Sequence, residues 1–228
     1  MRNLEGSKQR AAESALEMVE DGQIIGLGTG STAKFAIEGV AKLVRGGMGL
    51  RGVPTSIATE KMARQLGIPL VDLNDTPRID ITIDGADEVD SDFSMIKGGG
   101  GALTREKLVA LASKKRIILV DETKLVSRLG QTRLLPIEVL PFAWTMSVRR
   151  LADIGGVASL RDHEGKPFVT DNGNYILDCA FGEIPDPPSL EKQIRLLPGV
   201  VESGLFIGIA DVLVIGYEDR VELRPRIA

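Results

Sequence analysis

The stretch Gln23–Thr32, which reads QIIGLGTGST, decides the fold because a short apolar run leads directly into a glycine-rich turn. Residues Gln23–Leu27 predict a buried strand. After the turn, apolar residues recur at helical spacing from Ala33 to Val44 and predict a helix. A strand, a glycine turn and a helix in this order open a parallel α/β unit.

The same alternation continues on both sides of this stretch. A helix is predicted over residues 4–21, ahead of the first strand. Further strands are predicted near Ser56, at Arg78–Ile83 and at Ile117–Val120. Helices are predicted at Glu60–Leu66 and after Thr104, which can cap its helix. Strands that alternate with helices imply a mostly parallel sheet covered on both faces.

The pattern changes after Gly130, where the elements follow the ferredoxin-like order β-α-β-β-α-β. In chain order the predicted elements are a strand at Leu134–Leu140, a helix at Ala143–Ile154, strands at Val157–Arg161 and Tyr175–Phe181, a helix at Ser189–Leu196 and a strand at Val200–Phe206. Pro136 predicts that the first of these strands lies at a sheet edge. Asn172-Gly173 predicts a hairpin turn.

We therefore expect an α/β protein with two domains. A Rossmann-like parallel-sheet domain is predicted over residues 1–129 and 205–228, and a smaller ferredoxin-like α+β domain over residues 130–204. The final hairpin, Val212–Ile215 with Val221–Arg224, is predicted to rejoin the first sheet.

Composition excludes several classes of protein. The 228 residues carry a net charge of −4, which argues against a basic face for nucleic acid. We expect no signal peptide and no membrane span, because the most apolar stretch, Gly204–Gly216, is short and contains Asp211. A single cysteine, Cys179, makes the cytoplasm the default compartment. With one histidine as well, the chain lacks the clusters that zinc sites and Ser-His-Asp triads need.

The turn Gly28–Thr32 is the first segment that could carry chemistry. Glycines let the backbone approach a ligand, and the amides at the helix start, with the Ser31 and Thr32 hydroxyls, suit a phosphate. A capped strand-to-helix turn is the alternative. With Ala33 the segment also fits a weak dinucleotide fingerprint, but Pro54–Thr59 lacks the acidic residue that such sites use.

The segment Asp84–Glu88, DGADE, follows the carboxyl end of a strand, where open α/β sheets bind ligands. Carboxylates at this place can hold sugar hydroxyls or move protons. An acidic turn is an equal alternative. Because Asp90 and Asp92 follow, a magnesium site is a third, although the spacing does not match a calcium loop.

The segment Lys97–Lys107, KGGGGALTREK, places four glycines before a helix. Glycine costs conformational entropy on folding, so such a run favours a role in which bare amides face an oxyanion. Lys97 could neutralise an enediolate oxygen, and Glu106 falls in the first helical turn. A flexible loop, a solvated lysine and an acid favoured by the helix dipole are the alternatives. Lys124, after the strand that ends at Asp121, could reach a ligand or be surface charge.

Several long motifs in register make a family resemblance specific. GLGTGST, DGADE, KGGGGALTREK and VDETK, in this order, resemble ribose-5-phosphate isomerase of the A type, as do TDNGNYILD and LPGVVESGLF in the smaller domain. The resemblance spans nearly the whole chain. It implies a sugar-phosphate substrate, no cofactor, no metal, and a homodimer or homotetramer.

The resemblance also implies roles for single residues. Glu106 is the implied proton acceptor and Lys97 lies against the reacting end of the substrate, with Asp84 assisting ring opening. The implied substrate contacts are Thr29, Gly30, Ser31, Thr32, Asp84, Gly85, Ala86, Asp87, Lys97, Gly98, Gly99, Gly100 and Lys124. Lys8 is a further candidate for the phosphate.

Three alternatives to an isomerase stay open at this stage. A sugar-phosphate sensor would need a recognition helix that the chain does not show. A nicotinamide-dependent oxidoreductase would need the missing acid. A magnesium-dependent hydrolase would lose activity in EDTA. The isomerase hypothesis requires three strand-end loops to converge near Glu106.

Overall fold

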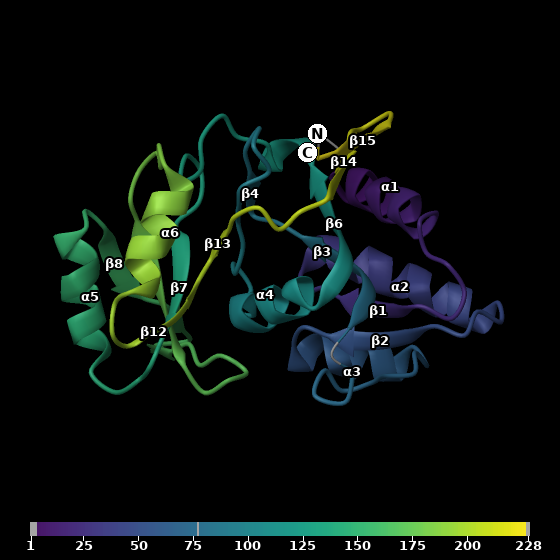
Figure 1. The fold of residues 1–228 in the computed structure, drawn as a ribbon, viewed down its shortest axis with the longest axis horizontal. Helices are drawn as coiled ribbons and strands as arrows, with labels where there is room; N and C mark the ends of the chain where they lie inside the picture. Colours follow the sequence, from purple (N-terminus) through teal and green to yellow (C-terminus); the bar gives the residue numbers. More distant parts are fainter. Residues whose placement is uncertain (1–3, 77, 227–228) are drawn as a thin grey trace. The chain divides into compact units, whose positions relative to one another are not determined.

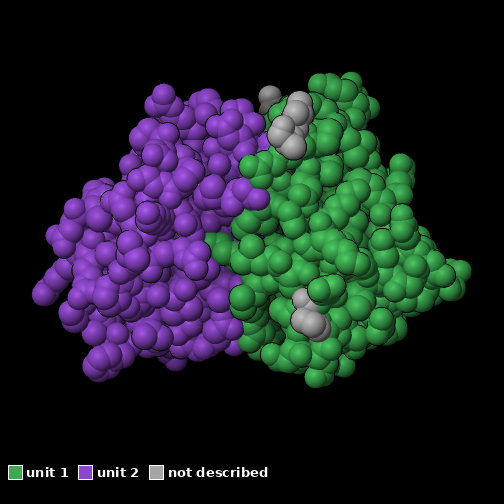
Figure 2. All heavy atoms as spheres, viewed as in Figure 1, with its two compact units in different colours: residues 1–86, 105–125, 209–228 green, residues 87–104, 126–208 purple. Residues whose placement is uncertain are grey.

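A computed structural model describes residues 4–76 and 78–226 of the chain. The chain forms two compact units, shown in different colours in Figure 2. Unit 1 comprises residues 1–86, 105–125 and 209–228, and unit 2 comprises residues 87–104 and 126–208. The bounds of these units differ from those of the two predicted domains, and the domain bounds remain a prediction.

Unit 1 is built around a six-stranded sheet of order β15-β14-β6-β3-β1-β2 (Figure 1). All neighbouring strands pair in parallel except the final hairpin, in which β15 is antiparallel to β14. The elements are α1 Leu4–Leu16, β1 Ile24–Leu27, α2 Ser31–Arg45, β2 Arg51–Pro54, α3 Ile57–Gln65, β3 Ile79–Gly85, most of α4 Leu103–Leu111, β6 Ser113–Asp121, the 3-10 turn η1 Glu122–Lys124, β14 Val212–Gly216 and β15 Val221–Pro225. This arrangement confirms the predicted parallel sheet and the return of the final hairpin to it.

The two faces of this sheet carry different helices. Alternate residues of β1 and β3, such as Ile25 and Ile83, pack with the alanine-rich faces of α1 and α2. Gly26 and its neighbour Thr82 point the other way, because a Cβ at Gly26 would lie 2.1 Å from Thr82 Oγ1 and 2.6 Å from Val109 Cγ1 of α4. Helix α4 therefore covers the opposite face from α1 and α2.

Unit 2 contains an antiparallel sheet of order β12-β7-β11-β8. The elements are β4 Glu88–Val89, β5 Met95–Ile96, β7 Leu135–Val139, α5 Trp144–Asp153, β8 Val157–Leu160, β9 Asp162–His163, β10 Lys166–Pro167, β11 Tyr175–Ala180, α6 Pro187–Arg195, β12 Val200–Ser203 and β13 Leu205–Phe206. The order β7-α5-β8-β11-α6-β12 confirms the ferredoxin-like prediction. The Asn172-Gly173 turn is present, since Gly173 N–H donates to Thr170 O at 2.9 Å.

The prediction of an edge strand at Pro136 is wrong, because β7 lies between β12 and β11. The ladder tolerates proline here because pairing with β12 ends at Ile137, opposite Ser203. The Pro136 carbonyl still accepts a hydrogen bond from Gly204 N–H at 2.7 Å. Proline thus removes a donor where the ladder no longer needs one.

Other boundaries also differ from the prediction. The first helix ends at Leu16 rather than at residue 21. The predicted strand over residues 200–206 is two strands, of which β13 pairs with β5 in a separate three-stranded sheet. Thr104 lies inside α4 rather than at its cap, and its hydroxyl donates to Glu138 Oε2. Within residues 4–76 and 78–226, no helix has the length and apolar character needed to cross a bilayer.

Candidate active site

Three predicted site segments in unit 1 follow neighbouring strands. Strands β1, β3 and β6 are adjacent and parallel, so their carboxyl ends meet at one edge of the sheet. The turn Gly28–Thr32 follows β1, Asp84–Ala86 lies at the end of β3, and Lys124 lies in η1 directly after β6. Unit 1 therefore gathers these segments along one edge, as the isomerase hypothesis requires of it.

Asp84 and the first turn are in direct contact. A Cβ at Gly28 would lie 2.2 Å from Asp84 Oδ1 and 2.6 Å from its Cα, so only glycine allows this approach. The same Oδ1 accepts hydrogen bonds from Thr29 N–H at 3.1 Å and from Gly85 N–H at 2.7 Å. Asp84 is 2% exposed. Two amides thus fix one oxygen of a buried carboxylate.

The start of α2 presents donors to solvent. Gly30 precedes the helix with a φ of 112°, a conformation that favours glycine, and it offers no side-chain cap. Ser31 is exposed, and its hydroxyl accepts a hydrogen bond from Lys8 Nζ at 3.0 Å. Thr32 lies beside the end of β3, since a Cβ at Gly85 would be 3.8 Å from Thr32 Cβ. Helix amides, two hydroxyls and an ammonium group together suit an anion.

The side chain of Thr29 belongs to a hydroxyl cluster. Its Oγ1 lies 2.8 Å from Thr55 Oγ1, 2.9 Å from Ser56 Oγ and 3.1 Å from Thr59 Oγ1. Thr59 also donates to Gly28 O at 3.0 Å. The cluster ties the turn after β1 to the start of α3. The sequence segment PTSIAT hinted at it through three hydroxyls, but we predicted no role for it.

Glu106 faces the sheet from α4, near the same edge. At the far end of this helix, Ala112 O accepts from Ile79 N–H at the start of β3. Three residues earlier in α4, Val109 packs against Gly26. Gly26 pairs with Thr82, which lies three residues after Ile79 in β3, so α4 and β3 run in opposite directions. Glu106 lies three residues before Val109, a distance of about 4.5 Å along the helix axis. Residues three apart share a face of a helix, so Glu106 lies on the same face as Val109. Glu106 is 4% exposed. It therefore lies on the buried side of α4, toward the end of the sheet that carries Asp84.

The remaining predicted contacts lie in unit 2. Asp87 Oδ2 accepts a hydrogen bond from Gly99 N–H at 2.8 Å, and Asp87 N–H donates to Ile96 O at 2.8 Å. Asp87 of the DGADE motif therefore contacts the glycine run Gly98–Gly101. Lys97 is 3% exposed, and its ammonium group lies 5.4 Å from the centroid of the Phe206 ring, a cation–π contact.

Glu88, in the same motif, has a structural role. It is fully buried, and its carboxylate accepts from Gly130 N–H at 2.6 Å, Thr132 N–H at 2.5 Å and Arg133 N–H at 2.8 Å. Thr132 Oγ1 adds a fourth hydrogen bond at 2.7 Å. Glu88 therefore holds the loop that leads into β7.

The acids considered for magnesium have other partners. Asp90 Oδ1 accepts from Asp92 N–H at 2.9 Å and from Ser94 N–H at 2.8 Å, closing a turn. Burial raises the pKa of Asp90, against the effect of these two amides. In the parts of the chain that the structure describes, no three His, Cys, Asp or Glu side chains form a metal-binding group.

Comparison with known proteins identifies the family. The model of the family described as ribose 5-phosphate isomerase A (phosphoriboisomerase A) matches residues 51–220. The chain belongs to the ribose 5-phosphate isomerase A family. It is 51% identical to ribose-5-phosphate isomerase A of Gloeobacter violaceus, covering 95% of this chain and 94% of that protein. It is 46% identical to the enzyme of Parvibaculum lavamentivorans, covering 97% and 98%.

Solved structures of ribose 5-phosphate isomerases agree with the fold. The enzyme of Methanocaldococcus jannaschii is 40% identical, with a TM-score of 0.92 and coverage of 96% of this chain and 98% of that one. A D-ribose-5-phosphate isomerase solved in complex with phospho-erythronic acid is 42% identical, with a TM-score of 0.95 and coverage of 98% and 100%. Membership in an isomerase family argues against the sensor, oxidoreductase and hydrolase alternatives.

Proposed function

We propose that this isomerase interconverts D-ribose 5-phosphate and D-ribulose 5-phosphate through an enediolate, with Glu106 moving the proton between C2 and C1. The observation that carries the proposal is a buried glutamate on the sheet-facing side of α4, toward the edge of the sheet where Asp84 lies in the last residues of β3. A positioned base of this kind typically contributes about 10²–10⁴-fold to the rate.

The phosphate is proposed to bind at the start of α2. The N-terminus of this 15-residue helix attracts anions. Thr32 and Ser31 supply hydroxyls, and Lys8 already reaches Ser31 Oγ at 3.0 Å. Thr29 and Gly30 are proposed to contact the substrate through the backbone, because the hydroxyl of Thr29 is engaged in the cluster around Thr59.

Asp84 is proposed to open the sugar ring: it accepts the proton of the anomeric hydroxyl while the bond from C1 to the ring oxygen breaks, and that proton then passes to the freed ring oxygen. Its Oδ1 is fixed by two amides, and this fixed geometry is what a proton-accepting group needs. Gly85 and Ala86 follow it at the strand end and are proposed to line the sugar, together with Asp87. Lys124, directly after the neighbouring strand, is proposed as a further contact.

Lys97 and the glycine run are proposed to stabilise the charge that develops on the substrate oxygen. A buried ammonium group and the backbone amides of Gly98 and Gly100 are donors suited to an enediolate, and Gly99 lies between them with its amide on Asp87. Phospho-erythronic acid, the ligand of the related structure, carries a planar carboxylate in place of the enediolate oxygens. That chemistry makes it a suitable probe for the proposed donors.

We propose that the reaction needs no metal and no cofactor, since proton transfer by a carboxylate and charge stabilisation by an ammonium group account for it. The finer expectations stay proposals as well: a cytoplasmic homodimer or homotetramer that binds neither nucleic acid nor membrane. Activity in excess EDTA that equals the untreated rate would support the metal-free reaction.

The central test replaces Glu106 with glutamine. We expect kcat for ribose 5-phosphate to fall by about 10²–10⁴-fold, with KM nearly unchanged and with loss of deuterium exchange at C2. Glu60→Gln is a matched control, because Glu60 also lies in the first turn of a helix but pairs with Arg64 at the surface. Retention of more than a tenth of the wild-type kcat by Glu106→Gln would falsify the base assignment.

A further inference from the structure

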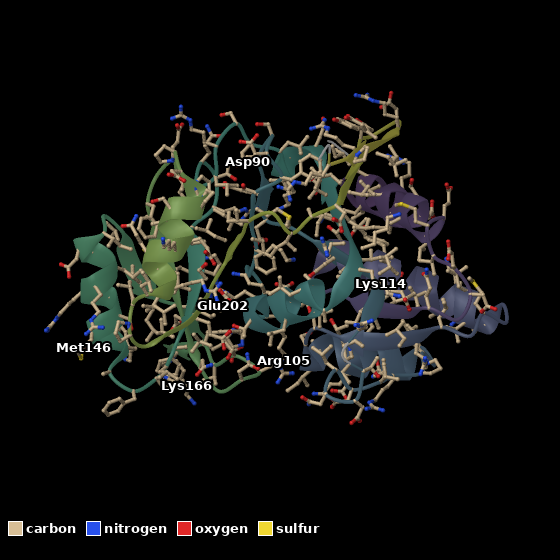
Figure 3. All side chains as sticks on the ribbon, viewed as in Figure 1. Asp90, Arg105, Lys114, Met146, Lys166 and Glu202 are labelled. Carbon is tan, nitrogen blue, oxygen red and sulfur yellow. The ribbon has the colours of Figure 1, made fainter. Side chains whose placement is uncertain are left out.

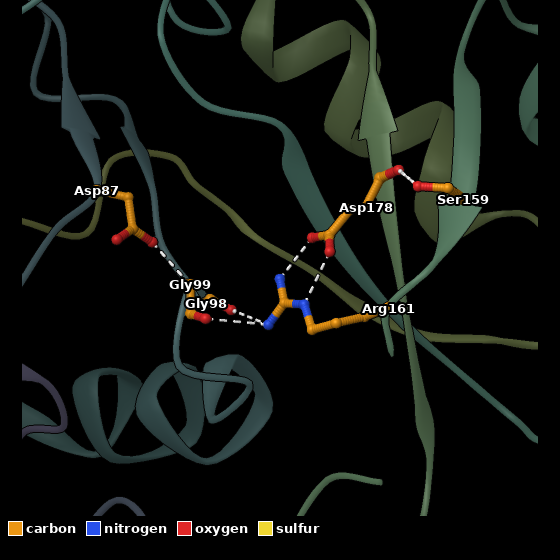
Figure 4. Close-up of polar contacts among 6 residues, drawn as sticks. All are labelled: Asp87, Gly98, Gly99, Ser159, Arg161 and Asp178. Carbon is orange, nitrogen blue, oxygen red and sulfur yellow. Dashed lines mark hydrogen bonds and ion pairs between the residues drawn. The ribbon is translucent and has the colours of Figure 1, made fainter. Parts of the chain in front are cut away.

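One arginine contacts two carbonyl groups of the glycine run, of which Gly98 O also accepts from Gly101 N–H at 2.9 Å. Arg161 Nη1 donates to Gly98 O and to Gly99 O, each at 3.1 Å (Figure 4). On the other side of the same peptide, Gly99 N–H donates to Asp87 Oδ2 at 2.8 Å. All of these residues belong to unit 2.

These hydrogen bonds fix the direction of the N–H groups of Gly99 and Gly100. A peptide bond is planar and trans, so the C=O of one residue and the N–H of the next point in opposite directions. Holding Gly98 O toward Arg161 therefore turns Gly99 N–H toward Asp87, as observed. Holding Gly99 O in the same way turns Gly100 N–H away from Arg161. The guanidinium thus helps to set the direction of the N–H groups of Gly99 and Gly100, together with the hydrogen bonds of Gly99 to Asp87 and of Gly101 to Gly98.

Arg161 is itself anchored on the sheet. Its Nε donates to Asp178 Oδ2 at 2.8 Å and its Nη2 pairs with Asp178 Oδ1 at 2.5 Å (Figure 4). Its backbone N–H donates to Ile176 O at 2.8 Å, and both partners belong to β11, the strand between β7 and β8. Only 15% of the Arg161 side chain and 21% of that of Asp178 are exposed.

Phe168 closes the arrangement. The guanidinium lies 5.7 Å from the centroid of its ring. A Cβ at Gly101 would be 2.3 Å from the same ring, so the end of the glycine run also packs on Phe168. A lysine at position 161 could not reproduce this set of contacts, because it lacks the planar fork that pairs with a carboxylate and still reaches two carbonyls.

We propose that Arg161, anchored by Asp178, is a positioning residue that aims the amide of Gly100 at the reacting oxygen of the substrate, while Asp87 holds the amide of Gly99. This rests on the proposed function of the glycine run. Arg161 acts through the backbone and touches no reacting atom. Its loss should therefore impair stabilisation of the enediolate more than binding of the substrate.

The test compares Arg161→Lys with Arg116→Lys. Arg116 is a matched control within unit 1: it pairs with Asp211 at 2.9 Å and donates to the carbonyls of Ser113 and Ile209. Misplacing a catalytic group by about 1 Å can cost about 10²-fold. We therefore expect Arg161→Lys to lower kcat by about 10–100-fold and to weaken binding of phospho-erythronic acid by a similar factor, with KM within about 3-fold. Arg116→Lys should change Tm without changing kcat.

Asp178→Asn provides a second variant that keeps the guanidinium but removes the charged anchor. We expect its kcat to lie between those of wild type and Arg161→Lys. Equal kcat values for wild type, Arg161→Lys and Arg116→Lys would overturn the inference, and so would an effect on KM alone. If Arg161→Lys does not fold, a wild-type kcat in Asp178→Asn overturns it. Failure of the proposed function would show differently, as a wild-type protein that does not isomerise ribose 5-phosphate.

Discussion

Glu88 offers a direct way to separate structural from catalytic acids in the DGADE motif. Replacing Glu88 with alanine removes a fully buried carboxylate that accepts four hydrogen bonds from the loop Gly130–Arg133. We expect this variant to lose stability while each folded molecule keeps its activity. The partners of Glu88 are backbone and hydroxyl groups of the loop before β7.

The magnitude follows from which donors water can reach after the substitution. Thr132 and Arg133 are exposed, so water replaces the carboxylate at their amides. Gly130 is half-buried, and an unsatisfied amide there costs about 1–3 kcal/mol. The cavity left by the missing side-chain atoms adds a cost of about 2 kcal/mol. The free energy of unfolding should therefore fall by about 3–5 kcal/mol.

Glu88→Gln should lose less, about 1–2 kcal/mol, because its amide oxygen can still accept from the loop while its NH2 group faces Gly130 N–H. Urea unfolding gives the order of stabilities, and hydrogen exchange at Gly130, Thr132 and Arg133 reports the local opening. The reasoning is refuted if Glu88→Ala unfolds within 1 kcal/mol of wild type, or if its kcat falls as far as that of Glu106→Gln.

Two further predictions concern packing and ionisation. Gly28→Ala places a Cβ 2.2 Å from Asp84 Oδ1. We expect the free energy of unfolding to fall by about 1–3 kcal/mol and kcat to be lower. Gly49→Ala, in which the nearest contact of the new Cβ would be 3.6 Å, is the control in the same urea and rate assays. Burial raises the pKa of the Cys179 thiol from 9.0 to about 12. The unfolded chain loses this proton first, so stability should fall as pH rises between about 9 and 12; urea unfolding of Cys179→Ala should show a shallower decline, and equal slopes would contradict the assignment.

The fold followed from the sequence wherever local pattern and tertiary structure agree. The strand at Ile24–Leu27 and the glycine turn after it gave the parallel unit, because buried strands and positive-φ turns leave a local signature. Pro136 led to the wrong prediction of an edge strand. A proline is tolerated in a central strand where the pairing with the neighbouring strand ends, and here that neighbour, β12, lies more than sixty residues away in sequence. The sequence near Pro136 does not indicate where the pairing with such a distant strand ends.

The residues of the candidate site also differ in how far the sequence indicated them. Gly28 and Asp84 were found through motifs, because Gly28 serves through its lack of a side chain and Asp84 through its charge. Arg161 was missed, because its partners are the carbonyls of glycines, which carry no side-chain signal in the sequence. Lys114, labelled in Figure 3, also forms an ion pair, with Asp80 at 2.8 Å, but this pair holds no backbone of the predicted site. The backbone that Arg161 holds is what distinguishes it.

Glu138 is a second buried acid with structural partners, besides Glu88. Glu138, fully buried, accepts from Thr104, Thr170 and two asparagine side chains, Asn172 and Asn174. Like Glu88, it accepts several hydrogen bonds from groups that hold a loop in place, so we infer a structural role for it. Asp121 caps the turn η1 through Thr123. These contacts assign structural roles to Glu88 and Glu138, and our proposal for proton transfer concerns two other buried acids, Asp84 and Glu106. Asp84 has Oδ1 fixed by two amides at the strand end, which suits ring opening and leaves the C2 proton to Glu106.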